Sequence, residues 1–220
     1  MTAIKKDFVP EDTRSYCGNG FLKSGKAYFM KDNNGIIHYG GETCAKKKTN
    51  TDLTKIPDLT KALIKSIAGN QVNGGGNGNN GTSTITDKSR AMTYLVLREE
   101  KLVNWSFIQN YRFTQLTDLY NNYIQNSDLT QQEISSVLFY INKSVTNYDS
   151  KLSLENLETC YAYDYILERA LTHVNNRAFI EGLLANLKDK CYLTNAQING
   201  LDKWLEHLPQ MEECHLRNFN

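Results

Sequence analysis

The sequence predicts a mainly α-helical fold, in which a small N-terminal β-hairpin module precedes an all-α helical bundle built from two related helical hairpins. Residues 179–208 contain two apolar stripes at helical spacing, separated by a candidate N-cap, Thr194. Residues 115–141 repeat this pattern 64 positions earlier, with Thr130 as the corresponding cap. Residues 21–39 differ, because short β-prone runs alternate there with turn residues.

The N-terminal module is predicted to span residues 1–68. Two β-prone runs, 27–30 and 36–39, flank Asn34-Gly35. This dipeptide predicts a type I′ hairpin turn, which needs positive φ at both central residues. A pair of glycines ends the second run, and we expect a short helix to begin near Glu42.

The remainder of the front half divides into three segments. Residues 1–13 are polar and form an extended lead-in. Residues 52–67 carry apolar side chains at helical spacing and predict an amphipathic helix, with Pro57 in its first turn. Residues 69–87 are rich in glycine and asparagine and are typical of a flexible linker, so the domain boundary is placed there.

The all-α domain is predicted to span residues 88–220. Its first segment, 88–100, is either helical or partly extended. The first hairpin follows at about 106–143, and a middle helix begins at Ser153. The second hairpin runs to about residue 208, where a proline ends it.

Composition excludes several classes of protein. The chain has 25 basic and 24 acidic residues, so net charge alone favours neither nucleic acid nor membrane. Residues 1–70 nevertheless carry 12 basic and 7 acidic side chains, a basic front joined to an acidic body. No stretch reaches the ~20 apolar residues of a membrane span, and no signal peptide precedes the first polar residues. Five cysteines without a signal peptide indicate free thiols in the cytoplasm, or in the host cytoplasm if the protein is phage-encoded.

Catalytic motifs are absent from the sequence. The four histidines lack the HExxH spacing of metalloproteases, and no GxSxG is present. The run of glycines near residue 75 lacks the Lys-Ser/Thr of a phosphate-binding loop. We therefore expect a protein that is not an enzyme.

The front module resembles a known kind of cassette. Cys17-Gly18 precedes the hairpin, and His38-Tyr39-Gly40-Gly41-Glu42-Thr43-Cys44-Ala45-Lys46-Lys47 follows its turn. This arrangement resembles the treble-clef or zinc-ribbon-like cassettes of small phage-type accessory proteins, although Arg14 stands where the first knuckle cysteine would be. The segment Leu193-Thr194-Asn195-Ala196-Gln197 resembles the helical segment that often follows such cassettes. The resemblance implies a small accessory protein associated with nucleic acid.

The resemblance also makes zinc a candidate cofactor, with Cys17, His38 and Cys44 as its ligands. Structural zinc normally has four ligands, so Asp12 or a residue from elsewhere would complete the shell. The alternative is a metal-free module in which the two cysteines are small buried hydrophobic residues.

Nucleic-acid contact is predicted through residues 16–48, where lysines alternate with aromatic residues. Cations bind phosphates, and aromatic faces stack on bases. Lys46, Lys47 and Lys48 are expected at the start of a helix, where cations are disfavoured, and this placement favours a partner. The alternative is that the aromatic rings form the core of a small sheet and the lysines its solvated edge. The predicted contacts are Lys23, Lys26, Tyr28, Lys31, Tyr39, Lys46, Lys47 and Lys48, with the two tyrosines stacking on bases.

Two functions follow from these patterns. The first is a non-enzymatic accessory or regulatory protein that associates with nucleic acid. The alternative is a protein-binding module that inhibits or modulates a partner enzyme through the helical domain. Its tyrosines exceed what a core of this size needs, and exposed tyrosines are common binding anchors.

Overall fold

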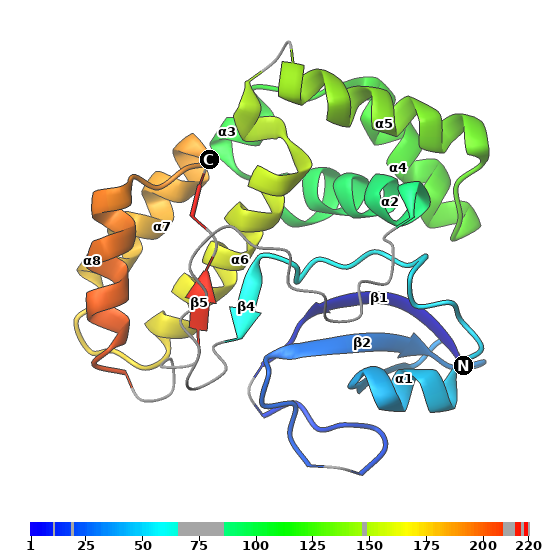
Figure 1. The fold of residues 1–220 in the computed structure, drawn as a ribbon, viewed down its shortest axis with the longest axis horizontal. Helices are drawn as coiled ribbons and strands as arrows, with labels where there is room; N and C mark the ends of the chain where they lie inside the picture. Colours follow the sequence, from blue (N-terminus) through cyan, green and yellow to red (C-terminus); the bar gives the residue numbers. More distant parts are fainter. Residues whose placement is uncertain are drawn as a thin grey trace, which may run out of the picture.

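The fold is mainly helical, with a small antiparallel sheet near the N-terminus, as the sequence predicts (Figure 1). The computed structural model describes residues 1–10, 12–18, 20–65, 86–146, 149–208, 214–216 and 218–219. The predicted linker at 69–87 therefore lies outside the described residues except for its end. There Thr86 caps the next helix by accepting a hydrogen bond from the backbone N–H of Ser89.

The N-terminal sheet has three strands in the order β1-β2-β3: β1 (Thr2–Phe8), β2 (Lys26–Lys31) and β3 (Ile37–Gly40). The segment predicted as an extended lead-in thus forms a strand of its own. The β2–β3 hairpin forms where Asn34-Gly35 predicts it, but the predicted type I′ turn is wrong. Only Gly35 has a positive φ, of 83°, and Asp32 instead bonds the backbone N–H groups of Asn34 and Ile36 with one carboxylate oxygen. That side chain stabilises a three-residue loop closed by glycine.

A short helix, α1 (Glu42–Lys48), packs on one face of this sheet. A small apolar core lies between them, and Met30 and Ala45 at its centre are fully buried. Gly40 is required at this contact, because a Cβ there would lie 2.9 Å from both Met30 and Cys44. The close approach of α1 to the sheet covers the face of β2 that carries Tyr28 and Met30.

The amphipathic helix predicted at 52–67 does not form. Asp52 and Asp58 each accept hydrogen bonds from the backbone and the hydroxyl of the threonine two residues later. These local bonds compete with helical ones. Leu59 is buried instead by strand-like pairing, since its N–H donates to the carbonyl of Lys6 at 2.9 Å. The segment ends in strand β4 (Leu63–Lys65), which pairs with β5 (Cys214–Leu216).

The two helical hairpins form as predicted. The first consists of α4 (Thr114–Asn126) and α5 (Gln131–Thr146), and the second of α7 (Ala178–Lys190) and α8 (Asn195–Leu205). Both second helices begin with a capping box. Thr194 and Gln197 bond each other's backbone N–H groups, and Thr130 and Glu133 do the same.

The other helices pack against these hairpins. The segment predicted as helical or partly extended is helical throughout. The middle helix begins after Ser153, as predicted, and the Ser153 hydroxyl accepts a hydrogen bond from the backbone N–H of Asn156. The helices that follow residue 86 and lie outside the two hairpins are α2 (Asp87–Val96), the π-helix η1 (Leu97–Lys101), α3 (Ser106–Gln109), the 3₁₀ helix η2 (Ser150–Leu152) and α6 (Leu154–Leu171).

The sheet and the helices share one hydrophobic core. Phe8 of β1 stacks on Tyr165 of α6 with ring centroids 4.3 Å apart, and Leu59 and Ala62 belong to the same cluster as the helical residues. Of the three strands of the N-terminal sheet, β1 lies nearest to the helical part of the molecule in Figure 1. The module predicted at 1–68 therefore contributes to the main core of the domain predicted at 88–220, in addition to the small core that it holds beneath α1.

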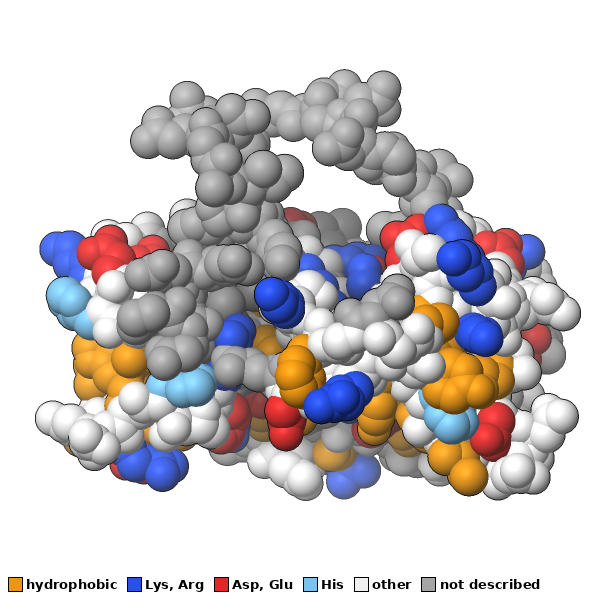
Figure 2. All heavy atoms as spheres, turned by 90° about the horizontal axis from the view of Figure 1, so that it is seen from below, with side chains coloured by type: hydrophobic (Ala, Val, Ile, Leu, Met, Phe, Trp, Pro, Cys, Tyr) orange, Lys and Arg blue, Asp and Glu red, His pale blue; other side chains and the backbone are white. Residues whose placement is uncertain are grey.

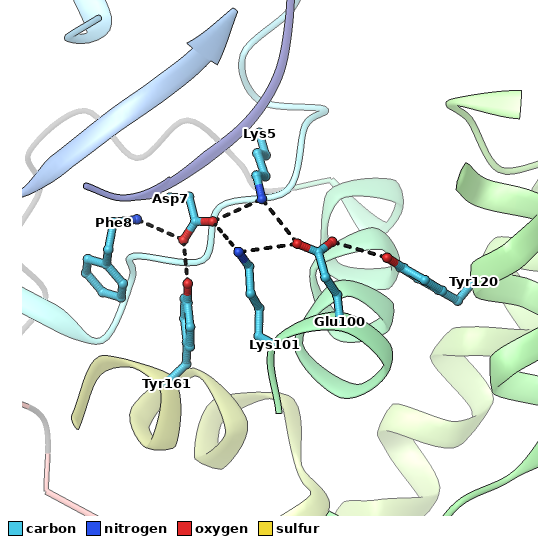
Figure 3. Close-up of polar contacts among 7 residues, drawn as sticks. All are labelled: Lys5, Asp7, Phe8, Glu100, Lys101, Tyr120 and Tyr161. Atoms are coloured by element: carbon cyan, nitrogen blue, oxygen red, sulfur yellow. Dashed lines mark hydrogen bonds and ion pairs between the residues drawn. The ribbon is translucent and has the colours of Figure 1, made fainter. Parts of the chain in front are cut away.

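A polar cluster joins the same two parts (Figure 3). Asp7 is buried and contacts the ammonium groups of Lys5 and Lys101 at 3.1 and 2.8 Å, while Glu100 contacts both lysines from the helical side. Burial lowers the pKa of Lys101, but the charges of Asp7 and Glu100 outweigh it and hold that pKa above its usual range. Lys101 therefore stays protonated and neutralises the buried carboxylate.

Candidate nucleic-acid interface

The two cysteines of the predicted zinc site form a disulfide. Cys17 and Cys44 are bonded with their Cα atoms 5.9 Å apart, which closes a separation of 27 residues. The prediction of free thiols is therefore wrong for this pair, because α1 packs back against the loop that holds Cys17. Cys160 and Cys191 are free and buried.

His38, the third predicted zinc ligand, has another partner. Its Nε2 lies 3.0 Å from the carboxylate of Asp32, and its ring lies 4.6 Å from that of Tyr16. The hydrogen bond with His38, together with those from the backbone of Ile36 and Asn34, holds the pKa of Asp32 below its usual value. Within the described ranges no three His, Cys, Asp or Glu side chains come together as metal ligands. The predicted shell of Cys17, His38 and Cys44 is thus replaced by a disulfide and a His–Asp pair.

Tyr28, predicted to stack on bases, lies on the sheet face that α1 covers. It is half-buried beside the small core, and the ammonium of Lys6 lies 5.6 Å from its ring. Burial, with smaller effects from Glu42 and Asp58, raises the pKa of Tyr28 to about 12. Tyr39 lies on the opposite face, where its ring meets Phe29 edge-on at 4.9 Å. The covered position of Tyr28 leaves little of its ring for a base.

The predicted lysines do not form one surface. Lys26 and Lys31 lie at opposite ends of β2, roughly 17 Å apart at the rise of a strand. Lys46, Lys47 and Lys48 occupy the last turn of α1 rather than its start, so the helix dipole favours them there and a partner is not needed to explain them. Lys46 also pairs with Glu42 at 2.5 Å. Lys23 is exposed in the loop before β2.

Two exposed aromatic rings lie before β2, within the range predicted for nucleic-acid contact but outside the list of predicted contact residues. Tyr16 is 46% exposed and Phe21 is 49% exposed. The ammonium of Lys48 lies 5.7 Å from the Tyr16 ring, and the guanidinium of Arg14 lies 4.9 Å from the Phe21 ring. We call the segment from Arg14 to Phe21 the aromatic loop. Its signal in the sequence is an aromatic residue on each side of Cys-Gly-Asn-Gly, with a basic residue nearby.

Three interactions restrain the backbone of the aromatic loop: a β-bridge, a hydrogen bond to β3 and a disulfide to α1. Its ends pair as a β-bridge between Arg14 and Phe21, and the N–H of Tyr16 donates to the carbonyl of Tyr39 in β3 at 2.7 Å. The disulfide from Cys17 ties the loop to α1. The backbone is therefore anchored at Tyr16 and at Phe21, the two residues that carry the exposed rings, and this anchoring lowers the entropy cost of binding.

Charge on the surface around the module is dispersed. On the described part of the face drawn in Figure 2, Lys and Arg side chains lie among apolar and polar ones and do not merge into a continuous basic surface. A ligand bound here would gain more from the aromatic rings than from many phosphate contacts. None of the helices in the described part of the chain is long and apolar enough to cross a membrane.

Comparisons with protein-family models, curated proteins and solved structures found no match to this chain.

Proposed function

We propose that the protein is a non-enzymatic accessory protein that binds single-stranded nucleic acid through the aromatic loop. Tyr16 and Phe21 stack on two bases, and Arg14 and Lys48 contact the adjoining phosphates. The observation that carries the proposal is that both rings are about half exposed and each already has a cation beside it. Aromatic rings with neighbouring cations are the usual components of single-strand binding surfaces.

A single strand fits this surface better than a duplex does. Stacking on a side chain requires an unpaired base, and each stacked base contributes roughly 1–3 kcal/mol. Among the described residues, Arg14 and Lys48 are the cations beside the two rings, so binding should depend weakly on salt, with a log–log slope of about −1.4 for two phosphate contacts. The proposal keeps Lys48 from the predicted contacts and replaces Tyr28 and Tyr39 with Tyr16 and Phe21.

The test is fluorescence anisotropy of the full chain with a labelled single-stranded oligonucleotide and with the matching duplex, at several salt concentrations and without reductant. Replacing both Tyr16 and Phe21 with alanine should weaken single-strand binding at least tenfold, because two stacking contacts of about 1–3 kcal/mol each are lost. Phe179→Ala is the matched control, since that ring is 41% exposed but lies on α7.

Two results would overturn the proposal. One is wild-type protein that binds no oligonucleotide at low salt. The other is a Tyr16→Ala, Phe21→Ala variant that binds as tightly as the wild-type protein and the Phe179→Ala control.

A second candidate function is a protein-binding module that modulates a partner through the helices. It is favoured by Phe139 of α5, whose side chain is 59% exposed beside an open groove. This function predicts that a protein complex survives the loss of Tyr16 and Phe21 but fails with Phe139→Ala, the reverse of the pattern expected for nucleic acid.

A further inference from the structure

The two helical hairpins are copies of one backbone unit. Moving α4 by 64 positions reproduces the bounds of α7, and the same shift moves the start of α5 to the start of α8. The residue after each first helix has a positive φ, 53° at Ser127 and 47° at Cys191, again at the same offset. Equivalent side chains in the two hairpins can therefore be compared position by position.

In the second hairpin an aromatic ring lies between the helices. Phe179 is the second residue of α7, and its ring lies 6.2 Å from that of Trp204 on α8. The ring also passes close to Gly200, where a Cβ would be 3.6 Å from it. Phe179 therefore covers the groove between α7 and α8.

In the first hairpin the same groove is open. Gln115 occupies the position of Phe179, Tyr140 that of Trp204 and Ser136 that of Gly200. The Tyr140 hydroxyl donates a hydrogen bond to the Gln115 side chain, and these residues line a groove of about 700 Å³ between α4 and α5. The two helices that form it, α4 and α5, lie at the upper right of the molecule in Figure 1. The groove between α4 and α5 thus has the same backbone as the one that Phe179 covers, but Gln115 in the position of Phe179 provides no aromatic ring to cover it.

An exposed aromatic side chain lies on the edge of this groove. Phe139 is 59% exposed, the highest exposure among the large hydrophobic residues of the described chain, and its counterpart in the second hairpin is Lys203. The ammonium of Lys143 lies 5.4 Å from its ring. Across the groove, Asp118 is exposed and makes no ion pair with any residue that the structure describes. The same surface thus offers an aromatic ring with a cation and a groove with an anion.

We propose that two copies of this chain associate through their α4–α5 faces. Phe139 of each copy enters the groove of the other, in the place that Phe179 takes in the second hairpin, and Lys143 of each faces Asp118 of the other. An interface with two-fold symmetry requires one patch that is complementary to itself. The α4–α5 face meets that requirement, because it carries both Phe139 and the groove that would receive it, and both Lys143 and Asp118. The association does not depend on nucleic acid.

Sedimentation velocity over a range of protein concentrations tests the association. Wild-type protein should form dimers, and Phe139→Ala should raise the dissociation constant roughly 1,000-fold, because a central aromatic anchor typically costs about 2 kcal/mol when truncated and each symmetric dimer loses two of them. Gln115→Phe should abolish dimers by filling the groove from within. Gln115→Ala is its matched control, since it also loses the hydrogen bond from Tyr140 but leaves the groove open, and it should still dimerise.

A charge exchange tests the orientation of the two copies. Lys143→Glu and Asp118→Lys should each weaken the dimer, and the protein that carries both changes should recover it. Circular dichroism of each variant checks that the helices are intact. Wild-type protein that remains monomeric at all concentrations, or Gln115→Phe protein that dimerises like the wild type, would overturn the proposal. A monomer whose groove binds a different protein would also overturn it.

Discussion

Tyr161 donates a hydrogen bond of 2.9 Å to Asp7, a residue 154 positions earlier in the chain (Figure 3). Asp7 also accepts from the backbone N–H of Phe8 at 2.8 Å and pairs with Lys101. The sheet and α6 are thus joined by a buried carboxylate whose charge and hydrogen-bonding capacity are both used. This cluster should make the stability of the helices depend on the N-terminal strand.

Asp7→Ala should lower the free energy of unfolding by about 3 kcal/mol, because it leaves Lys101 partly buried without its main partner. Urea unfolding monitored by circular dichroism measures this. Glu100→Gln is the matched control: its side chain is 35% exposed, and it should cost less than about 1 kcal/mol. Equal losses for both variants would contradict the assignment of Asp7 as the centre of the cluster.

Gly25→Ala should destabilise the fold by more than about 2 kcal/mol. The residue has a φ of +62°, and an added Cβ would overlap the hydroxyl oxygen of Tyr165. Tyr165→Phe removes that oxygen, so the double variant should lose less stability than the sum of the two single variants. Gly18→Ala is the control, since its φ of +75° carries similar backbone strain but its Cβ meets open space. Additive losses in Gly25→Ala, Tyr165→Phe protein would argue against this packing.

Tyr28→Phe should leave nucleic-acid affinity unchanged, because α1 covers that face of the sheet.

The same substitution should alter the dependence of stability on pH. Burial raises the pKa of Tyr28 to about 12 in the folded protein, whereas the pKa of a tyrosine in the unfolded chain is near 10. Between these values the phenol is protonated in the folded state and ionised in the unfolded state. Stability is therefore lost as the pH rises above 10, and Tyr28→Phe should reduce that loss. Ultraviolet titration of tyrosinate should show one fewer group near pH 12. A clear fall in oligonucleotide binding would instead place Tyr28 at the interface.

Asp164→Asn should alter the dependence of stability on pH. Burial raises the pKa of Asp164 above its ordinary value of 3.8, although the charge of Lys188 acts in the opposite direction. Because the folded state then holds this proton more tightly, ionisation of Asp164 lowers stability as the pH rises from about 3.8. Lys188 does not titrate in this range: burial lowers its pKa, but Asp164 and Glu168 outweigh that effect and raise it.

The measurement for Asp164 is urea unfolding at a series of pH values from about 3 upward. The wild type should lose stability relative to Asp164→Asn above about pH 3.8, and the difference should level off once the carboxylate is ionised in both states. Glu168→Gln, which removes the more exposed partner of Lys188, serves as the control. Parallel curves for wild type and Asp164→Asn would show that burial does not perturb this carboxyl.

The helical half of the fold could be predicted because its signals are local. Apolar spacing defines each helix, and Thr130 and Thr194 fix where α5 and α8 begin through bonds that span three residues. The helix predicted at 52–67 does not form, and the reason is again local. Their apolar spacing is helical, but the side chains of Asp52 and Asp58 bond the backbone in turns.

The candidate interface was harder to predict because its geometry depends on contacts between distant segments. Alternation along β2 separates Tyr28 from Phe29, but it does not indicate that α1 folds over the face of Tyr28. In the same way, the spacing of Cys17 and Cys44 is compatible with metal ligands or with buried thiols. Only the return of α1 to the aromatic loop brings their sulfur atoms together.

The distance in sequence between β1 and α6 has a consequence for synthesis of the protein. A ribosome adds about 5–20 residues per second, so roughly 8–30 seconds pass between the synthesis of Asp7 and that of Tyr161, 154 positions later. Throughout that interval Phe8 and Val9 lack the tyrosines that cover them in the finished fold. The nascent chain therefore leaves Phe8 and Val9 without these contacts until α6 has been made, although the Ala3 side of β1 can already pack against Met30 and Ala45.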